Sequence, residues 1–325
     1  MLKIIISSLL VIVALGCSAT RDEVIDLEEN NRANIQNSLA FLIFNQEQNI
    51  LIPKASSKSR LPASTYNPSG AMYDPLGYAL GAALGEAIGR WIVSEDDTPQ
   101  FRSLPNSRLA FTKTMDFLPL FENQFKKVVN GGQSLITQYD VLDSKIKKDE
   151  LETLITNIKE DSSLVIRTKY FFSTNYRRIY VNTHVTMLLR EEDPDPVYQN
   201  NFLYVSYAVG KKGMSVEDVI RNWSESDGKR FKMVLSQGIN ENLRMLNMAL
   251  LDKNVTLVGQ QSGKDHILFW NPEGMRVEIS GVFVANDDYR RVLKSIKGNY
   301  YSIDNPNRYR ADLEKYLESQ YRSLL

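Results

Sequence analysis

The sequence predicts an α+β protein whose mixed or antiparallel sheet follows the order βαβαβββα, with the helices mainly on one face. Three observations support this fold class. The spacing of apolar residues changes from the helical period of about 3.6 to the strand period of about 2 near residue 160. Two alternating segments, 163–173 and 178–189, flank the turn Thr174-Asn175, which is typical of an antiparallel hairpin. An apolar stripe beginning at Phe231 then predicts a long helix that covers the sheet.

The N-terminal part of the chain predicts a helix and a linker in front of this body. Residues 21–46 form a candidate helix, because apolar residues such as Leu39 and Leu42 recur at helical spacing. It is either a stalk or a helix docked on the body, and both interpretations stay open. Residues 48–73 are rich in proline and serine, which is typical of a linker. We therefore expect residues 17–73 to separate the body from the N-terminus.

Residues 74–94 form a second candidate helix with an unusual glycine repeat. Asp74 is placed to cap this helix, and Pro75 occupies its first turn. The predicted helix-contact residues are Gly77, Gly81, Gly85 and Gly89. Each glycine lowers the stability of a helix by about 1 kcal/mol relative to alanine. Close packing of another helix or sheet against the glycines must offset this loss of stability. The helix either packs within the body or is a glycine zipper that self-associates or enters the bilayer. A phosphate-binding loop is disfavoured because no Gly-Lys-Ser/Thr sequence follows.

The rest of the chain divides into an α/β region, residues 105–255, and an extension, residues 256–325. Strands of the first region are expected at 108–113, 135–141, 163–173, 178–189 and 201–209. Helices are expected at 116–129 and 147–159 and from Ser215 and Asp227 onwards. The extension is expected to hold a hairpin of 267–270 with 275–284 and a terminal helix at 308–324. The second face of the sheet is expected to be solvated.

The charge balance excludes one broad class of partner. The chain has 39 Lys and Arg against 39 Asp and Glu, so its formal net charge is zero. Proteins that bind nucleic acid carry excess basic residues that neutralise phosphates, so we expect no nucleic-acid partner. No apolar run after Cys17 is long enough to predict a second membrane span.

The first seventeen residues have the pattern of a secretory signal. Lys3 supplies a positive charge, and residues 4–15 form an apolar run that is short for a membrane span. The residues that close the segment are Ala14, Leu15, Gly16 and Cys17. They resemble the lipobox of bacterial lipoproteins. The resemblance implies that residues 1–16 are removed as a signal peptide and that Cys17 becomes the lipidated first residue of the mature chain.

Lipidation of Cys17 would explain why the chain has a single cysteine. Cys17 is the only cysteine, so no intramolecular disulfide can form. The resemblance implies that two or three acyl chains, such as palmitate, are attached to this cysteine. Stable membrane anchoring needs more than one acyl chain, and this modification supplies them. In the sorting rule of this family, Asp after the cysteine favours the inner membrane. Ser18 therefore implies the outer membrane, with the chain on its periplasmic side.

The arrangement predicted for residues 105–255 resembles the periplasmic α/β domain of outer-membrane lipoproteins such as the curli secretion channel family and the penicillin-binding-protein activators. Residues 198–206 and 223–228 also look like segments of uncharacterised proteobacterial lipoproteins. The glycine repeat resembles the glycine-zipper segments of envelope lipoproteins. These resemblances imply a periplasmic body.

Few residues offer catalytic or metal-binding chemistry. His184 is expected to lie exposed on the polar face of its strand with Asn182 and Thr186, and His266 is expected to be structural. The chain has no paired Cys or His at metal-ligand spacing and no Gly-x-Ser-x-Gly elbow, so we predict no metal, no cofactor and no catalytic residue. In the acidic stretch 191–195, Pro194 and the following Pro196 disfavour a calcium loop, and no glycine stands at the required turn, so we expect a solvated loop.

These features predict a non-catalytic lipoprotein that binds or assembles other envelope proteins, or copies of itself, on the periplasmic side of the outer membrane. Two alternatives stay open. One is an envelope hydrolase that acts on glycan or lipid through paired carboxylates. The other is an oligomeric protein that inserts its glycine zipper into the membrane.

Overall fold

The computed structural model describes residues 24–35, 37–50, 117–130, 138–173, 175–190, 196–251, 265–270, 276–286 and 288–304, with single positions elsewhere. The predicted signal segment, Cys17 and the glycine-rich helix at 74–94 lie outside the described residues. Most of the strand predicted at 108–113 and of the helix predicted at 308–324 also lies outside them.

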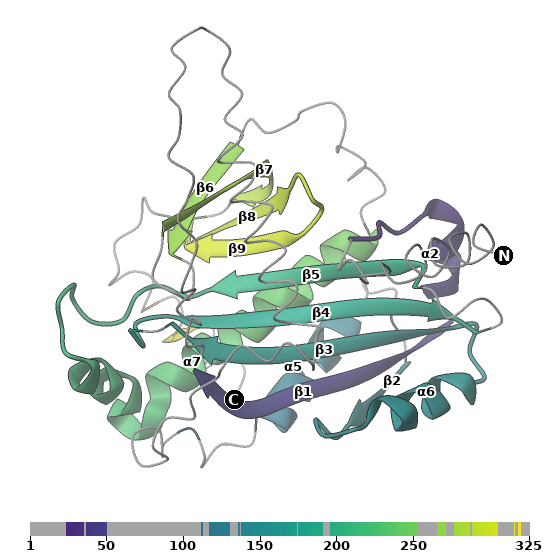
Figure 1. The fold of residues 1–325 in the computed structure, drawn as a ribbon, viewed down its shortest axis with the longest axis horizontal. Coiled ribbons are helices and arrows are strands. Elements are labelled where there is room, and N and C mark those ends of the chain that lie inside the picture. Colours follow the sequence, from purple (N-terminus) through teal and green to yellow (C-terminus); the bar gives the residue numbers. More distant parts are fainter. Residues whose placement is uncertain are drawn as a thin grey trace, which may run out of the picture.

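The described residues form one nine-stranded mixed sheet with helices packed on it, which confirms the predicted combination of α and β structure (Figure 1). The strand order is β2-β1-β3-β4-β5-β9-β8-β7-β6. The strands are β1 (Ser38–Ile50), β2 (Gln138–Leu142), β3 (Ser162–Phe172), β4 (Ile179–Leu189), β5 (Tyr198–Val205), β6 (Asp265–Trp270), β7 (Arg276–Asn286), β8 (Arg290–Ser295) and β9 (Tyr300–Asp304). The described helices are α2 (Glu29–Ile35), α5 (Leu118–Asn130), α6 (Lys148–Thr156) and α7 (Val216–Leu251).

The hairpin of β3 and β4 agrees with its prediction to within about one residue at each end, because strict alternation marks a strand clearly. The helix predicted over 21–46 is wrong for Ser38 onwards, where the chain forms β1. Residues 39–44 are apolar without interruption, and nearly all of them are buried, on both faces of the sheet. A strand buried on both faces does not alternate, so its pattern also fits a helix.

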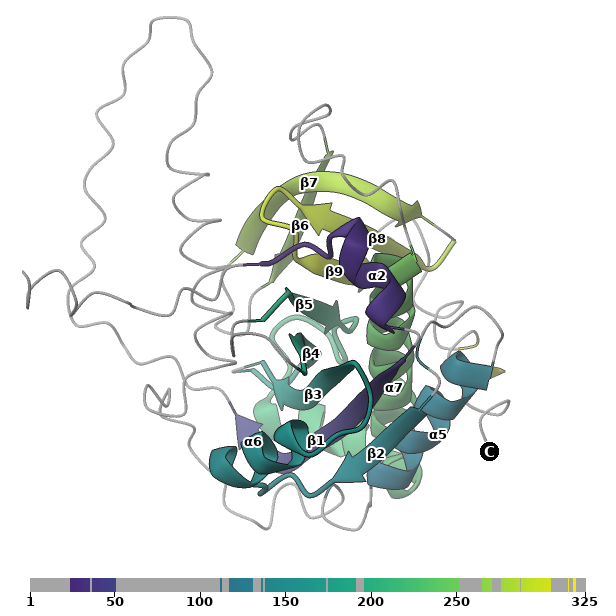
Figure 2. The same ribbon diagram turned by 90° about the vertical axis from the view of Figure 1, so that its right-hand side faces the viewer.

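The sheet is covered on both faces. On one face, α7 lies across β4 and β5 and α5 lies beside it over β1, and the two helices close the main core (Figure 2). Gly238 permits a close approach there, since a Cβ at this position would lie 2.4 Å from Cγ2 of Val181 in β4. On the other face, α6 packs Leu151 onto Phe41 of β1 and Val165 of β3. The expected solvated second face is therefore wrong.

The helix α7 consists of two helices joined by a tight break, in agreement with the two predicted helices. Ser226, Asp227 and Gly228 have φ angles of 54°, 56° and 68°. Glycine adopts this left-handed region freely, whereas Ser and Asp each pay about 1–2 kcal/mol for it. Trp223 fixes the first helix next to this break, because its Nε1 donates a hydrogen bond of 2.6 Å to the carbonyl oxygen of Tyr176.

The C-terminal strands continue the same sheet. β9 pairs in parallel with β5, and β8 and β7 follow in antiparallel order. The sequence did not predict β8 or β9, because Arg290, Arg291 and Lys294 interrupt the apolar pattern of β8. Arg290 and Lys294 are nevertheless buried in the structure. The predicted hairpin corresponds to β6 and β7.

Candidate functional site

The N-terminal segment of the described chain is docked on the body. The backbone of Ile25 exchanges two hydrogen bonds of 2.9 and 3.0 Å with Gln199 at the start of β5. Asp26 forms an ion pair with Lys294 of β8 at 3.3 Å. Val24 packs so tightly on the turn between β8 and β9 that a Cβ on Gly298 would approach it to 2.7 Å. The folded body therefore begins at or before residue 24.

Helix α2 and the strand after it extend this attachment. Arg32 of α2 donates a hydrogen bond of 2.5 Å to the carbonyl oxygen of Leu250 at the end of α7. Ser162 at the start of β3 donates one of 3.0 Å to the carbonyl oxygen of Asn34. The expectation that residues 17–73 separate the body from the N-terminus therefore does not hold for residues 24–50, which are part of the body.

The docked segment defines one end of the sheet, which we call the anchor end. It comprises residues 24–27, the turn at 296–299 and the end of α7 at Leu250. Six residues, 18–23, connect Cys17 to Val24. A fully extended chain spans about 3.3–3.6 Å per residue, so this connection reaches at most about 25 Å.

The opposite end, which we call the hairpin end, comprises the turn at 173–178, the loop at 206–215 and the break in α7. Arg177 ties the first two together by donating hydrogen bonds to the carbonyl oxygens of Val209 and Gly210, at 3.1 and 2.9 Å. All the described non-glycine residues with positive φ, Tyr176, Ser226 and Asp227, lie at this end. Strained backbone is characteristic of loops that serve recognition.

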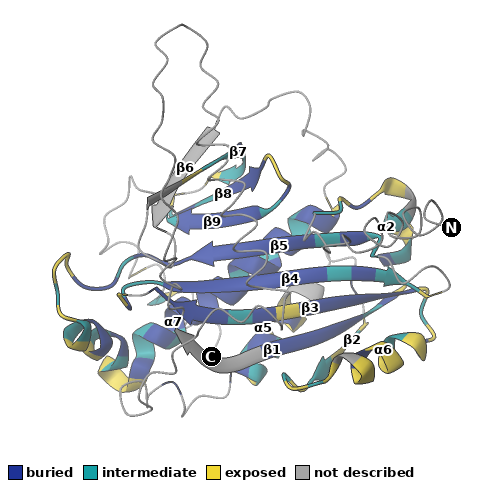
Figure 3. Ribbon diagram, viewed as in Figure 1, coloured by how far each residue is buried: buried dark blue, intermediate teal, exposed yellow. Residues whose placement is uncertain are grey.

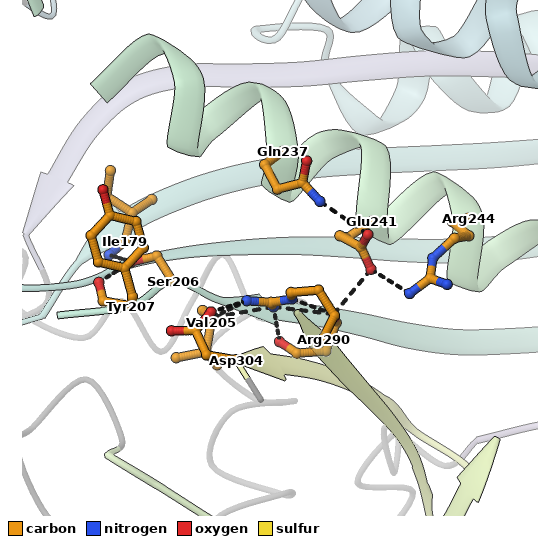
Figure 4. A network of polar contacts seen from close by, with 10 residues as sticks. Ile179, Val205, Ser206, Tyr207, Gln237, Glu241, Arg244, Arg290 and Asp304 are labelled. Atoms are coloured by element: carbon orange, nitrogen blue, oxygen red, sulfur yellow. Dashed lines mark hydrogen bonds and ion pairs between the residues drawn. The ribbon is translucent and has the colours of Figure 1, made fainter. Parts of the chain in front are cut away.

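A buried polar network joins the C-terminal strands to the body (Figure 4). Its centre is Arg290 of β8, whose side chain is 1% exposed. The guanidinium forms an ion pair with Asp304 and donates hydrogen bonds to the carbonyl oxygens of Ser302 and Val205, at 2.6 and 3.2 Å. It also lies 4.2 Å from the centroid of the Tyr204 ring. Arg290 thus connects β8, β9 and β5.

Glu241 extends the network to α7. It accepts hydrogen bonds from Ser302 Oγ at 3.1 Å and from Gln237 Nε2 at 3.0 Å, and it pairs with Arg244 at 2.8 Å. Burial raises the pKa of Asp304, while the nearby charge of Arg290 opposes that rise. A buried charge needs such partners, so these contacts assign the network a structural role.

A polar strip crosses the centre of the sheet on the face opposite α7. It consists of Arg167 and Lys169 of β3, Asn182, His184 and Thr186 of β4, and Asn201 of β5. Arg167 lies directly across from His184, which lies across from Asn201. Lys169 lies across from Asn182. The strip separates the two apolar clusters of this face, and its strands are largely buried (Figure 3).

His184 is held in a neutral form within the strip. Its Nδ1 lies 2.9 Å from Asn201 Oδ1, and its Nε2 lies 3.0 Å from Thr186 Oγ1. Burial and, to a smaller extent, the charges of Arg167 and Lys169 lower the pKa of His184 to about 4, although the hydrogen bond to Asn201 opposes this shift. The expectation of an exposed histidine is wrong, because His184 is 8% exposed.

Two other members of the strip are unusual for their surroundings. Burial lowers the pKa of Lys169 to about 8. Asn182 is 1% exposed, and neither its side-chain oxygen nor its side-chain nitrogen has a hydrogen-bond partner. Alternation within β4 predicted that Asn182, His184 and Thr186 share a face, but not that this face is buried.

The predicted site residues Cys17, Gly77, Gly81, Gly85 and Gly89 lie outside the described residues. Within the described part of the chain, no helix is both long and apolar enough to cross a membrane. The same part contains no group of three or more His, Cys, Asp or Glu side chains that is placed to hold a metal ion. No family model, curated protein or solved structure matches this chain.

Proposed function

We propose that this chain is a lipid-anchored protein of the bacterial outer membrane that binds or assembles other envelope proteins on the periplasmic side without catalysing a reaction. The observation that carries the proposal is the docking of residues 24–27 on the body, a few residues after the lipobox-like Cys17. A lipid on Cys17 then holds the anchor end within about 25 Å of the bilayer. The anchor positions the body directly, without a long stalk.

The anchor end is suited to lie against lipid headgroups. Ile296 and Leu251 are 44% and 37% exposed, and among the large apolar side chains that the structure describes only Leu154 of α6 is similarly exposed, at 40%. Ile296 belongs to the turn that contacts Val24, and Leu251 follows the carbonyl group that Arg32 binds. Lys297, next to Ile296, adds an exposed positive charge that favours anionic headgroups.

This orientation directs the hairpin end away from the membrane. β4 has 11 residues and runs between the two ends. At about 3.3 Å per residue, it sets the hairpin end roughly 35 Å beyond the anchor end. The loops at 173–178 and 206–215 are then presented to partners in the periplasm, so recognition is assigned to them. The hydrolase and glycine-zipper alternatives stay predictions.

The anchor is tested by Cys17→Ala, or by globomycin, which blocks processing of bacterial lipoproteins. We expect the altered chain to keep its signal segment and to lose the detergent partitioning of an acylated protein, because no acyl chain is attached. Fractionation of the envelope and mass spectrometry of the N-terminal peptide measure both effects. Ser18→Ala is the matched control and should leave processing and partitioning intact. Unchanged processing and partitioning in Cys17→Ala would contradict the proposal.

A further inference from the structure

Residues 24–26 are attached to the body differently from the chain that follows them. Among the described residues, Leu27 and Ile35 belong to the main apolar core, whereas residues 24–26 do not. Ile25 is held by its two backbone hydrogen bonds with Gln199, which form an isolated pair outside the named strands. A short segment that contributes nothing to a core is the kind of element that opens locally in folded proteins.

The ion pair of this segment is exposed on one side. Asp26 Oδ1 lies 3.3 Å from Lys294 Nζ, but the side chain of Asp26 is 58% exposed and that of Lys294 only 9%. An ion pair with so exposed a carboxylate is weak, and salt screens it. Lys294 keeps another contact when Asp26 leaves, because its Nζ lies 5.7 Å from the centroid of the Tyr300 ring.

The elements on both sides of residues 24–26 are held by contacts of their own. On one side, hydrogen bonds of Arg32 and of the carbonyl group of Asn34 attach α2 to α7 and β3. On the other side, Gln199 stays in β5 through the pairing of that strand with β4. The body therefore keeps its structure when residues 24–26 detach from it.

We propose that residues 24–26 form a latch that opens without unfolding of the body, and that ionic strength controls this opening. In the closed state, Val24 packs against the turn that contains Gly298. In the open state, Leu27 is the first residue fixed to the body. The extended chain from Cys17 to Leu27 reaches at most about 36 Å, against about 25 Å to Val24. With the lipid anchor of the proposed function, on which this consequence rests, the latch regulates how closely the body approaches the membrane.

Amide hydrogen exchange of the full chain in detergent, resolved to single residues by mass spectrometry, tests the latch. The amides of Ile25 and Gln199 each donate to the other residue's carbonyl oxygen, so one opening exposes both. Their protection factors should therefore agree within about threefold. The amide of Ser206 donates a hydrogen bond of 2.9 Å to the carbonyl oxygen of Ile179, so it reports on the pairing of β4 and β5 in the body. Ser206 should be protected at least about tenfold more strongly than Gln199, because local opening needs less free energy than unfolding of the body.

Salt tests the electrostatic control of the latch. Between about 0.01 M and about 1 M sodium chloride, the screening length falls from about 30 Å to about 3 Å. The protection factors of Ile25 and Gln199 should then fall by about two- to fivefold, which is the contribution of an exposed ion pair. Asp26→Asn should show the lower protection already at low salt and should lose the salt response. Glu28→Gln, which removes a nearby exposed carboxylate, is the matched control and should keep the response.

The exchange measurement separates the latch from the lipid anchor, because it needs no lipid. Cys17→Ala should show the same protection factors at Ile25 and Gln199 as the lipidated chain, whatever its partitioning into detergent. Equal protection of Gln199 and Ser206 would show that the segment opens only together with the body, and it would overturn the latch. A salt response that persists in Asp26→Asn would overturn its electrostatic control. Either result leaves the separate test of the anchor by partitioning of Cys17→Ala unaffected.

Discussion

Arg290→Met is expected to lower the free energy of unfolding by about 3–5 kcal/mol, because it leaves the partly buried carboxylate of Asp304 without its counter-charge. Arg290 is 1% exposed and supplies the ion pair of Asp304 and the bonds to Ser302 and Val205. Its loss also removes a side-chain contact between β8 and β5 that adds to the pairing of β9 with β5. Urea unfolding followed by circular dichroism measures the change.

The pH dependence of this variant tests the cause. Burial raises the pKa of Asp304, and Arg290 opposes that rise in the wild type. Without Arg290, the folded-state pKa rises further above the unfolded value. An acid whose pKa is higher in the folded state loses stability as pH increases from the unfolded to the folded pKa. The variant should therefore be less destabilised near pH 4 than near pH 7.

Arg291→Met is the matched control for Arg290→Met. Arg291 is the next residue of β8 and lies on the opposite face of the sheet, with its guanidinium 5.6 Å from the centroid of the Phe283 ring. A half-buried contact of this kind contributes about 1 kcal/mol. A loss as large as that of Arg290→Met, or a pH-independent loss in Arg290→Met, would show that the buried charges are not the cause.

His184→Gln is expected to remove a large part of the acid sensitivity of the fold. Burial lowers the pKa of His184 to about 4, so the unfolded chain binds a proton more readily than the folded chain between roughly pH 6.5 and pH 4. Stability therefore falls as pH falls through this window, by roughly 3 kcal/mol at pH 4. Glutamine has no such titration and keeps polar atoms that can reach Asn201 and Thr186.

The difference in unfolding free energy between wild type and His184→Gln should thus shrink or reverse as the pH falls from 7 to 4. His266→Gln removes the other histidine of the chain and should leave the acid slope of the wild type in place. If His266→Gln flattened the slope and His184→Gln did not, the neutral buried state of His184 would be refuted.

Local pattern alone predicted much of the fold. The alternation in β3 and β4 fixed both strands, and helical spacing located α5 and α6. β1 was not predicted, because a strand that is buried on both faces shows no alternation of apolar and polar residues. β8 was not predicted, because its buried Arg290 and Lys294 are stabilised by Asp304 and Asp26, which lie outside the strand. Such partners leave no local signal.

The candidate sites show the same limit. Alternation placed Asn182 and His184 on one face, but their burial depends on pairing with β3 and β5. The docking of Ile25 beside Gln199 joins two segments that lie far apart in the sequence. The spacing of apolar residues within either segment gives no sign of this contact. For that reason the sequence left a stalk and a docked helix equally open, whereas the structure places residues 24–27 on the body.

The most direct test of the proposed anchoring measures which end of the body contacts lipid. Cys17 is the only cysteine, so once it is acylated an introduced cysteine is the only free thiol. Nitroxide labels on Lys297→Cys at the anchor end and Lys212→Cys at the hairpin end can be compared in the lipidated protein in vesicles. Membrane-soluble oxygen should relax the label at 297 strongly, while a water-soluble nickel chelate should dominate at 212. Equal aqueous exposure of both labels, or a reversed order, would contradict the proposed orientation on the membrane.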